Sequence, residues 1–321
     1  MLKYAHLALV LFLILPGFLA CKKCDDQVDY RAEMRNFVST ISTIAKAQNP
    51  NFIIIPQNGQ ELATDASGAL YIDYLAKIDG QAREDMYYGY DKDNIATPTD
   101  ISNAWELTLD QMKTAGKSIL CIDYCSTPSF MSDAYIKNQN KAYISFSAPD
   151  RDLASIPSYP IHNENATDIM TLSEAKNFLY LINGAKYATK SDFITAVKNT
   201  NYDVIVMDLF QNEEVFTASE IESLKVKLNG GKRLVICYMS IGEAENYRYY
   251  WQKKWKLQRP AWLGAQNPDW PGNYKVCYWN SDWQNIICNA NDSYLQKILD
   301  AHFDGTYLDI IDAFEYYENK N

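Results

Sequence analysis

Histidine is scarce in this sequence, and its few copies stand far apart. Only three occur among the 321 residues, at positions 6, 162 and 302. A Ser-His-Asp triad needs a histidine beside its nucleophile, and histidine-based zinc sites need several such ligands, so we expect neither. No lysine follows a predicted strand as a Schiff-base candidate. The sequence therefore implies no metal site and no cofactor.

Positive charge is scarce as well. The 40 acidic residues outnumber the 30 lysines and arginines, which gives a formal net charge of −10. Proteins that bind nucleic acids take their affinity from a basic surface, so we expect no nucleic-acid partner. No GxGxxG or P-loop sequence follows a predicted strand, and no internal repeat is evident. These absences argue against a dinucleotide-binding sheet and against a solenoid.

The first 28 residues are typical of an export and anchoring segment. Lys3 precedes an apolar run, and the sequence FLAC that ends at Cys21 resembles a bacterial lipobox. We expect a signal peptide at 1–20 that is removed, lipidation of Cys21, and a charged tether at 21–28. Because Lys22 rather than aspartate follows the cysteine, the resemblance implies sorting to the outer membrane. Ordinary secretion, with Cys21 as a free or paired thiol, is the alternative.

Short apolar strands alternate with amphipathic helices along residues 29–321. Eight strands are predicted at 52–55, 84–88, 118–122, 178–182, 203–207, 234–239, 276–279 and 306–311, and the run 142–146 is left outside this set. Helices are predicted at 29–47, 101–115, 191–198, 219–228 and 283–301, and residues 148–171 form an irregular connector. This alternation favours an α/β fold, a single (β/α)8 TIM barrel. A doubly wound open sheet is the alternative.

Polar and aromatic side chains gather after these strands. The candidates are Gln57, Asn58, Glu84, Asp85, Asp123, Tyr124, Asp208, Tyr238, Glu243, Glu245, Asp309 and Asp312. In a parallel barrel these strand ends collect at one face, where catalytic groups lie. Carboxylates, amides and aromatic rings on one rim suit a carbohydrate, and paired carboxylates are the usual apparatus of glycoside hydrolysis. For any single acid, a helix cap or a solvated loop is the simpler interpretation.

Three long segments carry a resemblance to a known family. The segments VICYMSIGEAENYRYYW (235–251), WPGNYKVCYWNSDW (270–283) and FDGTYLDIIDAFEYYE (303–318) resemble glycoside hydrolase family 114, and most closely its bacterial and archaeal relatives. The resemblance implies a (β/α)8 barrel. It also implies an activity like that of the characterised family members, which are endo-α-1,4-polygalactosaminidases. Weaker likeness extends over most of residues 29–318.

The order of the segments differs from that of the family. In the family, the strand resembling Tyr307-Leu-Asp309 lies in mid-chain, and a helix and strand like those at 34–59 follow it. Here that helix and strand come first, which predicts a circular permutation in which residues 148–171 join what would be the family's two termini. Exposed connections tolerate permutation. We therefore expect the first helix to pack beside the final strand; a truncated or tandem arrangement is the alternative.

The resemblance also assigns candidate site residues. It places one catalytic carboxylate on Asp309 and, through a looser match, the other on Glu84. One would act as nucleophile or stabiliser and the other as acid/base, and the resemblance favours retention, for which carboxyl groups lie about 5–5.5 Å apart. The substrate-binding candidates are Asn58, Asp123, Asp208, Tyr238, Glu243, Arg248 and Asp312. Alternatively, Glu243 and Glu245 open the following helix, and Arg248 pairs with one of them.

We expect an exported lipoprotein, anchored to the outer membrane through Cys21, that hydrolyses an amino-sugar-containing or related polysaccharide in an endo-acting manner. An acidic rim would attract a cationic, partly deacetylated galactosamine polymer. Two alternatives stay open. A non-catalytic glycan-binding protein would keep the barrel and its aromatic rim but hold the two carboxyl groups far apart. A scaffolding lipoprotein would have no cleft, and its tyrosines and tryptophans would be buried in the core.

Overall fold

The computed structural model describes residues 28–320 of the chain. Residues 1–27 and 321 lie outside the described part, so the signal peptide, the tether and the lipidation of Cys21 stay predictions. None of the described helices is long and apolar enough to cross a membrane.

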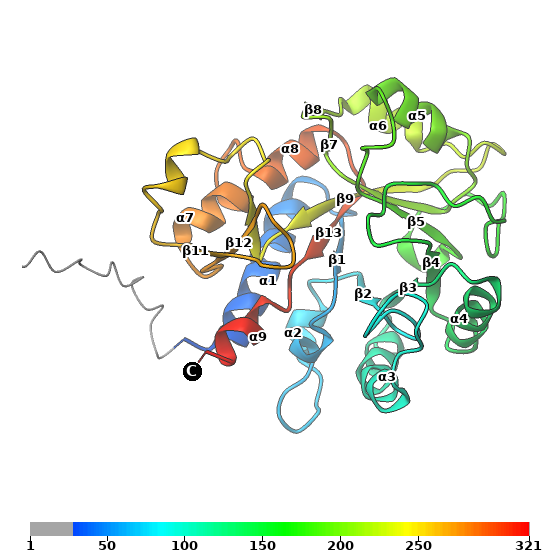
Figure 1. Ribbon diagram of the computed structural model, residues 1–321, viewed down its shortest axis with the longest axis horizontal. Coiled ribbons are helices and arrows are strands. Elements are labelled where there is room, and N and C mark those ends of the chain that lie inside the picture. The colour runs from blue at the N-terminus through cyan, green and yellow to red at the C-terminus, as the bar shows by residue number, and fades with distance from the viewer. Residues whose placement is uncertain (1–27, 321) are drawn as a thin grey trace, which may run out of the picture.

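Eight parallel strands form the centre of the described residues (Figure 1). They are β1 (Ile53–Pro56), β2 (Gly80–Glu84), β3 (Ser118–Tyr124), β4 (Ile144–Ala148), β5 (Phe178–Leu181), β6 (Val204–Met207), β9 (Leu234–Ser240) and β13 (Gly305–Asp309). One sheet has the order β1-β13-β9-β6-β5 and a second has the order β2-β3-β4. A parallel bridge between Gln57 and Ala82 links β1 to β2. On the far side β4 lies beside β5, where the Phe146 and Phe178 rings are 5.7 Å apart.

Helices cover the outside of these strands, and the strands are therefore buried on both faces (Figure 1). All seven residues of β9 are buried. The helices are α1 (Tyr30–Gln48), α2 (Ile72–Leu75), α3 (Thr99–Thr114), α4 (Pro128–Asn140), α5 (Lys190–Lys198), α6 (Ala218–Leu224), α7 (Ser281–Gln284), α8 (Tyr294–Asp300) and α9 (Ala313–Glu318). In α1 the Asp29 side chain accepts a hydrogen bond from the Ala32 N–H at 2.9 Å, which caps the helix, and Met34, Phe37 and Ile41 form its buried face.

Two strand predictions differ from the structure: one run left outside the parallel set belongs to it, and one run placed in the set does not. The run left aside is β4, a full member of the parallel set, although Ser145 and Ser147 interrupt its apolar character. The run at 276–279 was expected to be parallel, and this prediction is wrong. It overlaps β12 (Asn273–Val276), which pairs antiparallel with β10 (Glu243–Glu245) and β11 (Leu263–Gln266) in a small separate sheet. Periodicity in four residues cannot distinguish a central strand from an accessory one. A further two-residue hairpin pairs β7 (Phe210–Gln211) with β8 (Glu214–Val215).

Three further element boundaries differ from the prediction. The strand expected within 84–88 lies earlier and ends at Glu84, because Asp85 turns the chain with a φ of 57°. The helix expected at 283–301 is broken into α7, a π-helical turn and α8, because Ser293 starts a new helix by capping the Gln296 N–H. Helix α6 ends at Leu224, before its predicted end, and α4 was not predicted at all.

The first strand lies beside the last strand, and the first helix packs on the helix that follows the last strand. Strand β1 pairs with β13 in the register Ile53 with Gly305. The two backbones are close here, since a Cβ on Gly305 would lie 2.4 Å from the Ile53 carbonyl oxygen. Helix α1 packs on α9, where the Arg31 Nε and Glu318 Oε1 atoms are 2.8 Å apart. Figure 1 shows the blue and red ends of the chain side by side.

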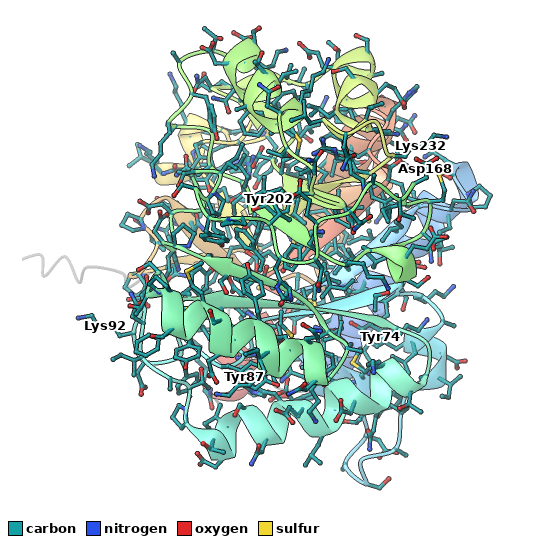
Figure 2. The ribbon with its side chains drawn as sticks, turned by 90° about the vertical axis from the view of Figure 1, so that its right-hand side faces the viewer. Tyr74, Tyr87, Lys92, Asp168, Tyr202 and Lys232 are labelled. Carbon is teal, nitrogen blue, oxygen red and sulfur yellow. The ribbon has the colours of Figure 1, made fainter. Side chains whose placement is uncertain are left out.

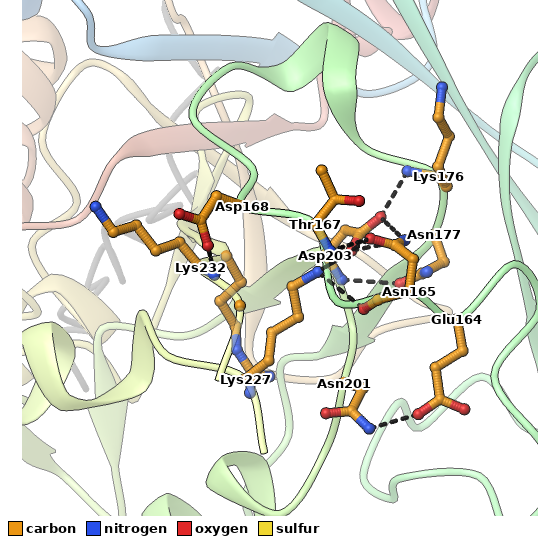
Figure 3. Close-up of polar contacts among 12 residues, drawn as sticks. Glu164, Asn165, Thr167, Asp168, Lys176, Asn177, Asn201, Asp203, Lys227 and Lys232 are labelled. Atoms are coloured by element: carbon orange, nitrogen blue, oxygen red, sulfur yellow. Dashed lines mark hydrogen bonds and ion pairs between the residues drawn. The ribbon is translucent and has the colours of Figure 1, made fainter. Parts of the chain in front are cut away.

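A buried ion pair fixes the connector at the start of β6 (Figure 3). Lys227 Nζ lies 2.6 Å from Asp203 Oδ1, and both side chains are fully buried. The Asn165 amide and the Lys176 N–H also donate to the Asp203 carboxylate, at 3.0 and 2.8 Å. Nearby, where Figure 2 labels Asp168 and Lys232 at one edge of the molecule, the Lys232 N–H donates to Asp168 at 2.9 Å. The connector is therefore attached to the sheet by charge-assisted hydrogen bonds.

Replacing Lys227 with methionine should destabilise the protein, because Asp203 would stay buried without its charged partner. We expect a loss of about 3–5 kcal/mol of unfolding free energy, measured by chemical denaturation. Lys232→Met, at an exposed lysine of the same loop, is the matched control and should change the unfolding free energy little. Adding Asp203→Asn to Lys227→Met should recover part of the loss. A loss below about 1 kcal/mol, the range of a surface pair, would contradict the prediction.

Candidate active site

A cavity of about 890 Å³ lies at the carboxyl ends of the parallel strands. Its volume falls in the range usual for ligand pockets. Seven of the nine residues predicted to react with or bind substrate line it: Asn58, Glu84, Asp208, Tyr238, Arg248, Asp309 and Asp312. They come from the ends of five strands that are remote in sequence, so the parallel sheet brings them together.

Asp309 ends β13 and faces the cavity from a nearly buried position, with 9% of its surface exposed. Its carboxylate accepts hydrogen bonds from the Tyr238 hydroxyl at 2.6 Å and from the Ile310 N–H at 2.8 Å. Burial and the nearby charge of Glu84 nevertheless raise the pKa of Asp309 well above its ordinary value. The two hydrogen bonds oppose that rise but do not cancel it.

Glu84 ends β2 and lines the same cavity. The Tyr124 hydroxyl donates to Oε1, and the Asn58 amide nitrogen lies 3.4 Å from Oε2. The Asn58 side-chain oxygen in turn accepts the Glu84 N–H at 3.2 Å, so Asn58 holds both the backbone and the carboxylate. Burial and the neighbouring charge of Asp85 raise the pKa of Glu84.

The two carboxyl groups therefore titrate as a pair. Ionisation of Glu84 disfavours ionisation of Asp309, so over an intermediate pH range one group holds a proton while the other is charged. Such a pair can donate a proton and present a negative charge in the same cavity. This combination is the basis of acid/base and nucleophilic catalysis.

Arg248 is held by two carboxylates at the cavity wall. Its Nη1 and Nη2 atoms each lie 2.7 Å from an oxygen of Asp208, and its Nε atom lies 2.5 Å from Glu245 Oε2. The Tyr247 hydroxyl donates to the other Glu245 oxygen at 2.6 Å. The partner of Arg248 within its own segment is thus Glu245 and not Glu243. A planar fork bound to two carboxylates is a rigid part of the wall.

Two residues predicted to bind substrate do not line the cavity. Asp123 is fully buried and accepts hydrogen bonds from the Tyr87 and Tyr88 N–H groups, at 2.6 and 2.9 Å. Successive residues of a strand point to opposite faces, so Asp123 holds the loop after β2 while Tyr124 reaches the cavity. Burial raises the pKa of Asp123 to about 6.

Glu243 is also fully buried outside the cavity lining. It lies 2.6 Å from the Lys275 Nζ atom and accepts a hydrogen bond from the Asn267 amide at 2.9 Å. Both partners bind the Oε1 atom, so Glu243 joins strands of the small antiparallel sheet to which it belongs. Its Oε2 atom is buried without a hydrogen-bond partner. The alternative in which Glu243 opens a helix is also corrected, because the residue starts β10.

Several lining residues escaped the sequence analysis. They are Arg151, Asp152, Leu153, Tyr180, Ile182, Asn183, Gly184, Ala185, Phe210, Gln211, Asn212, Glu213, Asn246, Asn273 and Ile310. Most belong to irregular segments, which carry no periodic signal. Three come from the connector itself. Asp312, which was predicted, has a pKa raised to about 6 by burial and by Glu315.

Exposed aromatic side chains stand at one side of the cavity. Tyr247, Tyr249 and Trp270 all line it, and they are 57%, 43% and 52% exposed. Large apolar rings that stay in water beside a cavity are available for a ligand, because they are not consumed by core packing. No group of three or more histidine, cysteine, aspartate or glutamate side chains within residues 28–320 is arranged to hold a metal ion.

The α/β fold, with its mostly parallel sheet and a cavity lined by paired carboxyl groups, is typical of an enzyme that uses acid/base chemistry. The comparison with known families identifies the family. The model of glycoside-hydrolase family GH114 matches residues 160–321, and the chain belongs to this family. An uncharacterised protein of Methanocaldococcus jannaschii is 38% identical over 182 residues, which cover 54% of this chain and 49% of that protein. One from Deinococcus radiodurans is 37% identical over 127 residues, 40% of this chain and 39% of that protein. The matched part of the chain thus spans half or less of each relative's length.

Asp309→Asn should stabilise the protein increasingly as the pH rises. The folded-state pKa of Asp309 lies above its unfolded value, so the wild type loses stability from about pH 4 upward until the folded pKa is passed. Asparagine cannot ionise and keeps an acceptor for Tyr238. Since one unit of raised pKa corresponds to about 1.4 kcal/mol, we expect a gain of about 1 kcal/mol or more at pH 8 and almost none at pH 4.

Denaturation of both proteins across pH 4 to 8 measures this difference. Asp65→Asn is the control of opposite sign, because hydrogen bonds from Ser67 and Ala69 lower the pKa of exposed Asp65. Its difference from the wild type should be a loss at neutral pH that disappears as the pH falls. A gain for Asp309→Asn that is the same at every pH would show that Asp309 does not titrate with a raised pKa.

Proposed function

We propose that this protein is a glycoside hydrolase whose two reacting carboxyl groups are those of Asp309 and Glu84. The observation that carries the proposal is that both groups line one cavity and that the charge of Glu84 raises the pKa of Asp309. Membership of family GH114 supports a carbohydrate substrate. One protonated and one ionised carboxyl group are the two parts that hydrolysis of a glycosidic bond requires.

In the proposed mechanism, one carboxylate attacks the anomeric carbon while the other carboxyl group gives its proton to the departing glycosidic oxygen. The bond to the leaving sugar breaks as an ester bond to the enzyme forms. The second group, now ionised, then takes a proton from a water molecule, whose oxygen attacks the anomeric carbon and frees the first carboxylate. Configuration is retained. Tyr238 and Tyr124 stabilise the ionised groups through their hydroxyl hydrogens.

We further propose that the eight parallel strands close into a (β/α)8 barrel of circularly permuted order. The bridge between Gln57 and Ala82 and the contact of β4 with β5 support closure. The pairing of β1 with β13 supports the permutation, since it places the first helix and strand where a family member would continue after the last strand. Residues 148–171 would then be the new junction.

The charges around the cavity favour a substrate that carries amino groups. Seven carboxyl groups line it, namely Glu84, Asp152, Asp208, Glu213, Glu245, Asp309 and Asp312, against the two arginines Arg151 and Arg248. Each arginine is already bound to two carboxylates. A cationic amino-sugar polymer would be attracted to this surface. The exposed rings beside the cavity can stack on sugar faces along a chain, which suits an endo-acting enzyme.

The N-terminal sequence supports the location of this activity. We propose that the protein is exported, cleaved before Cys21 and held at the outer membrane by lipid on that cysteine. Lipidation before a charged tether would place the catalytic part beside the membrane, where exported polysaccharides occur. Mass spectrometry of membrane fractions, with Cys21→Ser as the comparison, tests the modification.

Asp309→Asn and Glu84→Gln should each reduce hydrolysis by at least about 100-fold, the usual contribution of a positioned acid or base. Release of reducing ends from a panel of polysaccharides, including α-1,4-galactosamine polymers, measures it. Glu222→Gln, at an exposed glutamate of α6 outside the cavity lining, is the matched control and should keep full activity. Both substitutions are nearly isosteric, so circular dichroism should show folded proteins.

Loss of activity in Asp309→Asn alone would keep the hydrolase and move the second carboxyl group elsewhere in the cavity. Glycan binding by the wild type without hydrolysis of any substrate would contradict the proposal. It would favour a non-catalytic glycan-binding protein, for which the exposed ring of Trp270 would serve equally well. The cavity and its exposed rings are features of a ligand-binding protein rather than of a scaffold.

Trp270→Ala should weaken binding of long substrates more than binding of short ones. One lost aromatic contact of about 1.4 kcal/mol corresponds to a tenfold rise in KM, with kcat little changed if the ring binds sugars far from the reacting bond. The kinetic constants for polymers and for short oligosaccharides measure this. Tyr71→Ala, at an exposed tyrosine away from the cavity, is the control. A fall in kcat with unchanged KM would contradict this role.

A further inference from the structure

The connector contributes a cation to the cavity wall beside Glu84. Arg151 lies in the irregular segment between β4 and β5 and lines the cavity together with Asp152 and Leu153. Its Nη2 atom lies 2.7 Å from Asp85 Oδ1, and its Nε atom lies 2.6 Å from Asp93 Oδ1. One guanidinium group thus joins the connector to the first residue and to the middle of the loop that follows β2.

The loop after β2 is shaped to receive this arginine. Asp85 has a φ of 57°, a conformation that costs free energy for a residue other than glycine. Nη2 of Arg151 also donates to the Gly89 carbonyl oxygen. A Cβ on Gly89 would lie 2.2 Å from Asp85 Oδ1 and 3.0 Å from Nη2, so only glycine allows the three groups to meet.

Arg151 also touches the tyrosine that bonds to Glu84. Its guanidinium carbon lies 4.1 Å from the centre of the Tyr124 ring, a cation–π distance. The hydroxyl of the same ring donates to Glu84 Oε1. The arginine therefore contacts two neighbours of Glu84: Asp85, which follows it in the chain, and Tyr124, which binds its carboxylate.

We propose that Arg151 is a positioning residue for Glu84, and that the connector contributes to the site through this arginine. This inference rests on the proposed function of Glu84 as one of the two reacting carboxyl groups. The arginine fixes the direction of the Glu84 carboxylate through the loop and through Tyr124, and its charge stabilises the ionised form. A segment that merely linked two parts of the chain would need only to be long enough and soluble, and would not need to supply a side chain to the cavity.

The charge balance around Glu84 gives the sign of the effect. The titratable and charged groups that act on it are Arg83 and Asp85 from its own segment, Tyr124 from β3, Tyr180 from β5, Tyr307 and Asp309 from β13, and Arg151. Arg151 lowers the pKa of Glu84, while burial and Asp85 raise it. Removing the arginine charge should therefore raise the pKa of Glu84 further.

The experiment compares Arg151→Gln and Arg151→Lys with the wild type and with Lys186→Gln. Lys186 is a matched control, because it bonds to Ser155 of the same connector at 3.2 Å and is half exposed, but it does not line the cavity. The titration of Glu84 is followed by carbon-13 NMR of labelled glutamate, assigned with Glu84→Gln. The pH dependence of kcat is measured on the best substrate.

We expect Arg151→Gln to raise the pKa of Glu84, to shift the corresponding limb of the pH profile upward and to lower kcat by about tenfold or more, the usual cost of a misplaced group. Arg151→Lys keeps the charge but not the planar fork, so it should restore most of the pKa and only part of kcat. Lys186→Gln should match the wild type in both measurements.

An unchanged Glu84 titration in folded Arg151→Gln would overturn the inference. If that variant does not fold, Arg151→Lys decides, because a lysine protein equal to the wild type in kcat and in pKa would overturn it equally. The NMR titration needs no substrate. A raised pKa in a protein that hydrolyses nothing would therefore separate failure of the proposed function from failure of the role of Arg151.

Discussion

The repulsion between two carboxyl groups in one cavity is the constraint on which the site depends. Asp309 and Glu84 end β13 and β2, the neighbours of β1 on either side. Each group, when ionised, disfavours ionisation of the other, so the fold must supply donors that face them. Tyr238 and Tyr124 do so, and burial holds the pKa of both phenols far above the ordinary value. They therefore remain donors at any pH at which the carboxyls titrate.

The strand geometry decides which side chains can take part. Along β3, Tyr124 reaches the cavity, whereas Asp123, one residue earlier, accepts backbone hydrogen bonds on the other face. The same alternation gives the protein two buried acids with raised pKa values and different roles. Asp123 organises the loop that carries Asp85. A shift of one residue in this strand would replace the hydroxyl donor to Glu84 with a further carboxyl group in the cavity.

Much of this arrangement could be predicted from local sequence, and the rest could not. An apolar run followed by an acid marks Asp309 and Asp208, and parallel strands bring such ends together. Glu84 follows no apolar run, since Gly80, Gln81 and Arg83 precede it, and the family resemblance identified it as a catalytic candidate. The strand pattern fails for Asp123, since it does not say on which face a strand's last residues point. It fails for β4, because the two buried serines interrupt the apolar run that is typical of a central strand. It misses Arg151 altogether, because an irregular segment has no period and its contacts are tertiary.

The connector is attached at both ends of the parallel strands, and this explains how an irregular segment can belong to a site. At one end Asn165 joins the buried pair of Asp203 and Lys227, before β6 begins. At the other end Arg151 reaches Asp85 at the cavity. A segment held at two such points has lost much of its conformational freedom, so the side chains it places beside Glu84 stay in register. Under the proposed permutation, the connector would turn what would otherwise be two chain termini into a fixed wall of the cavity.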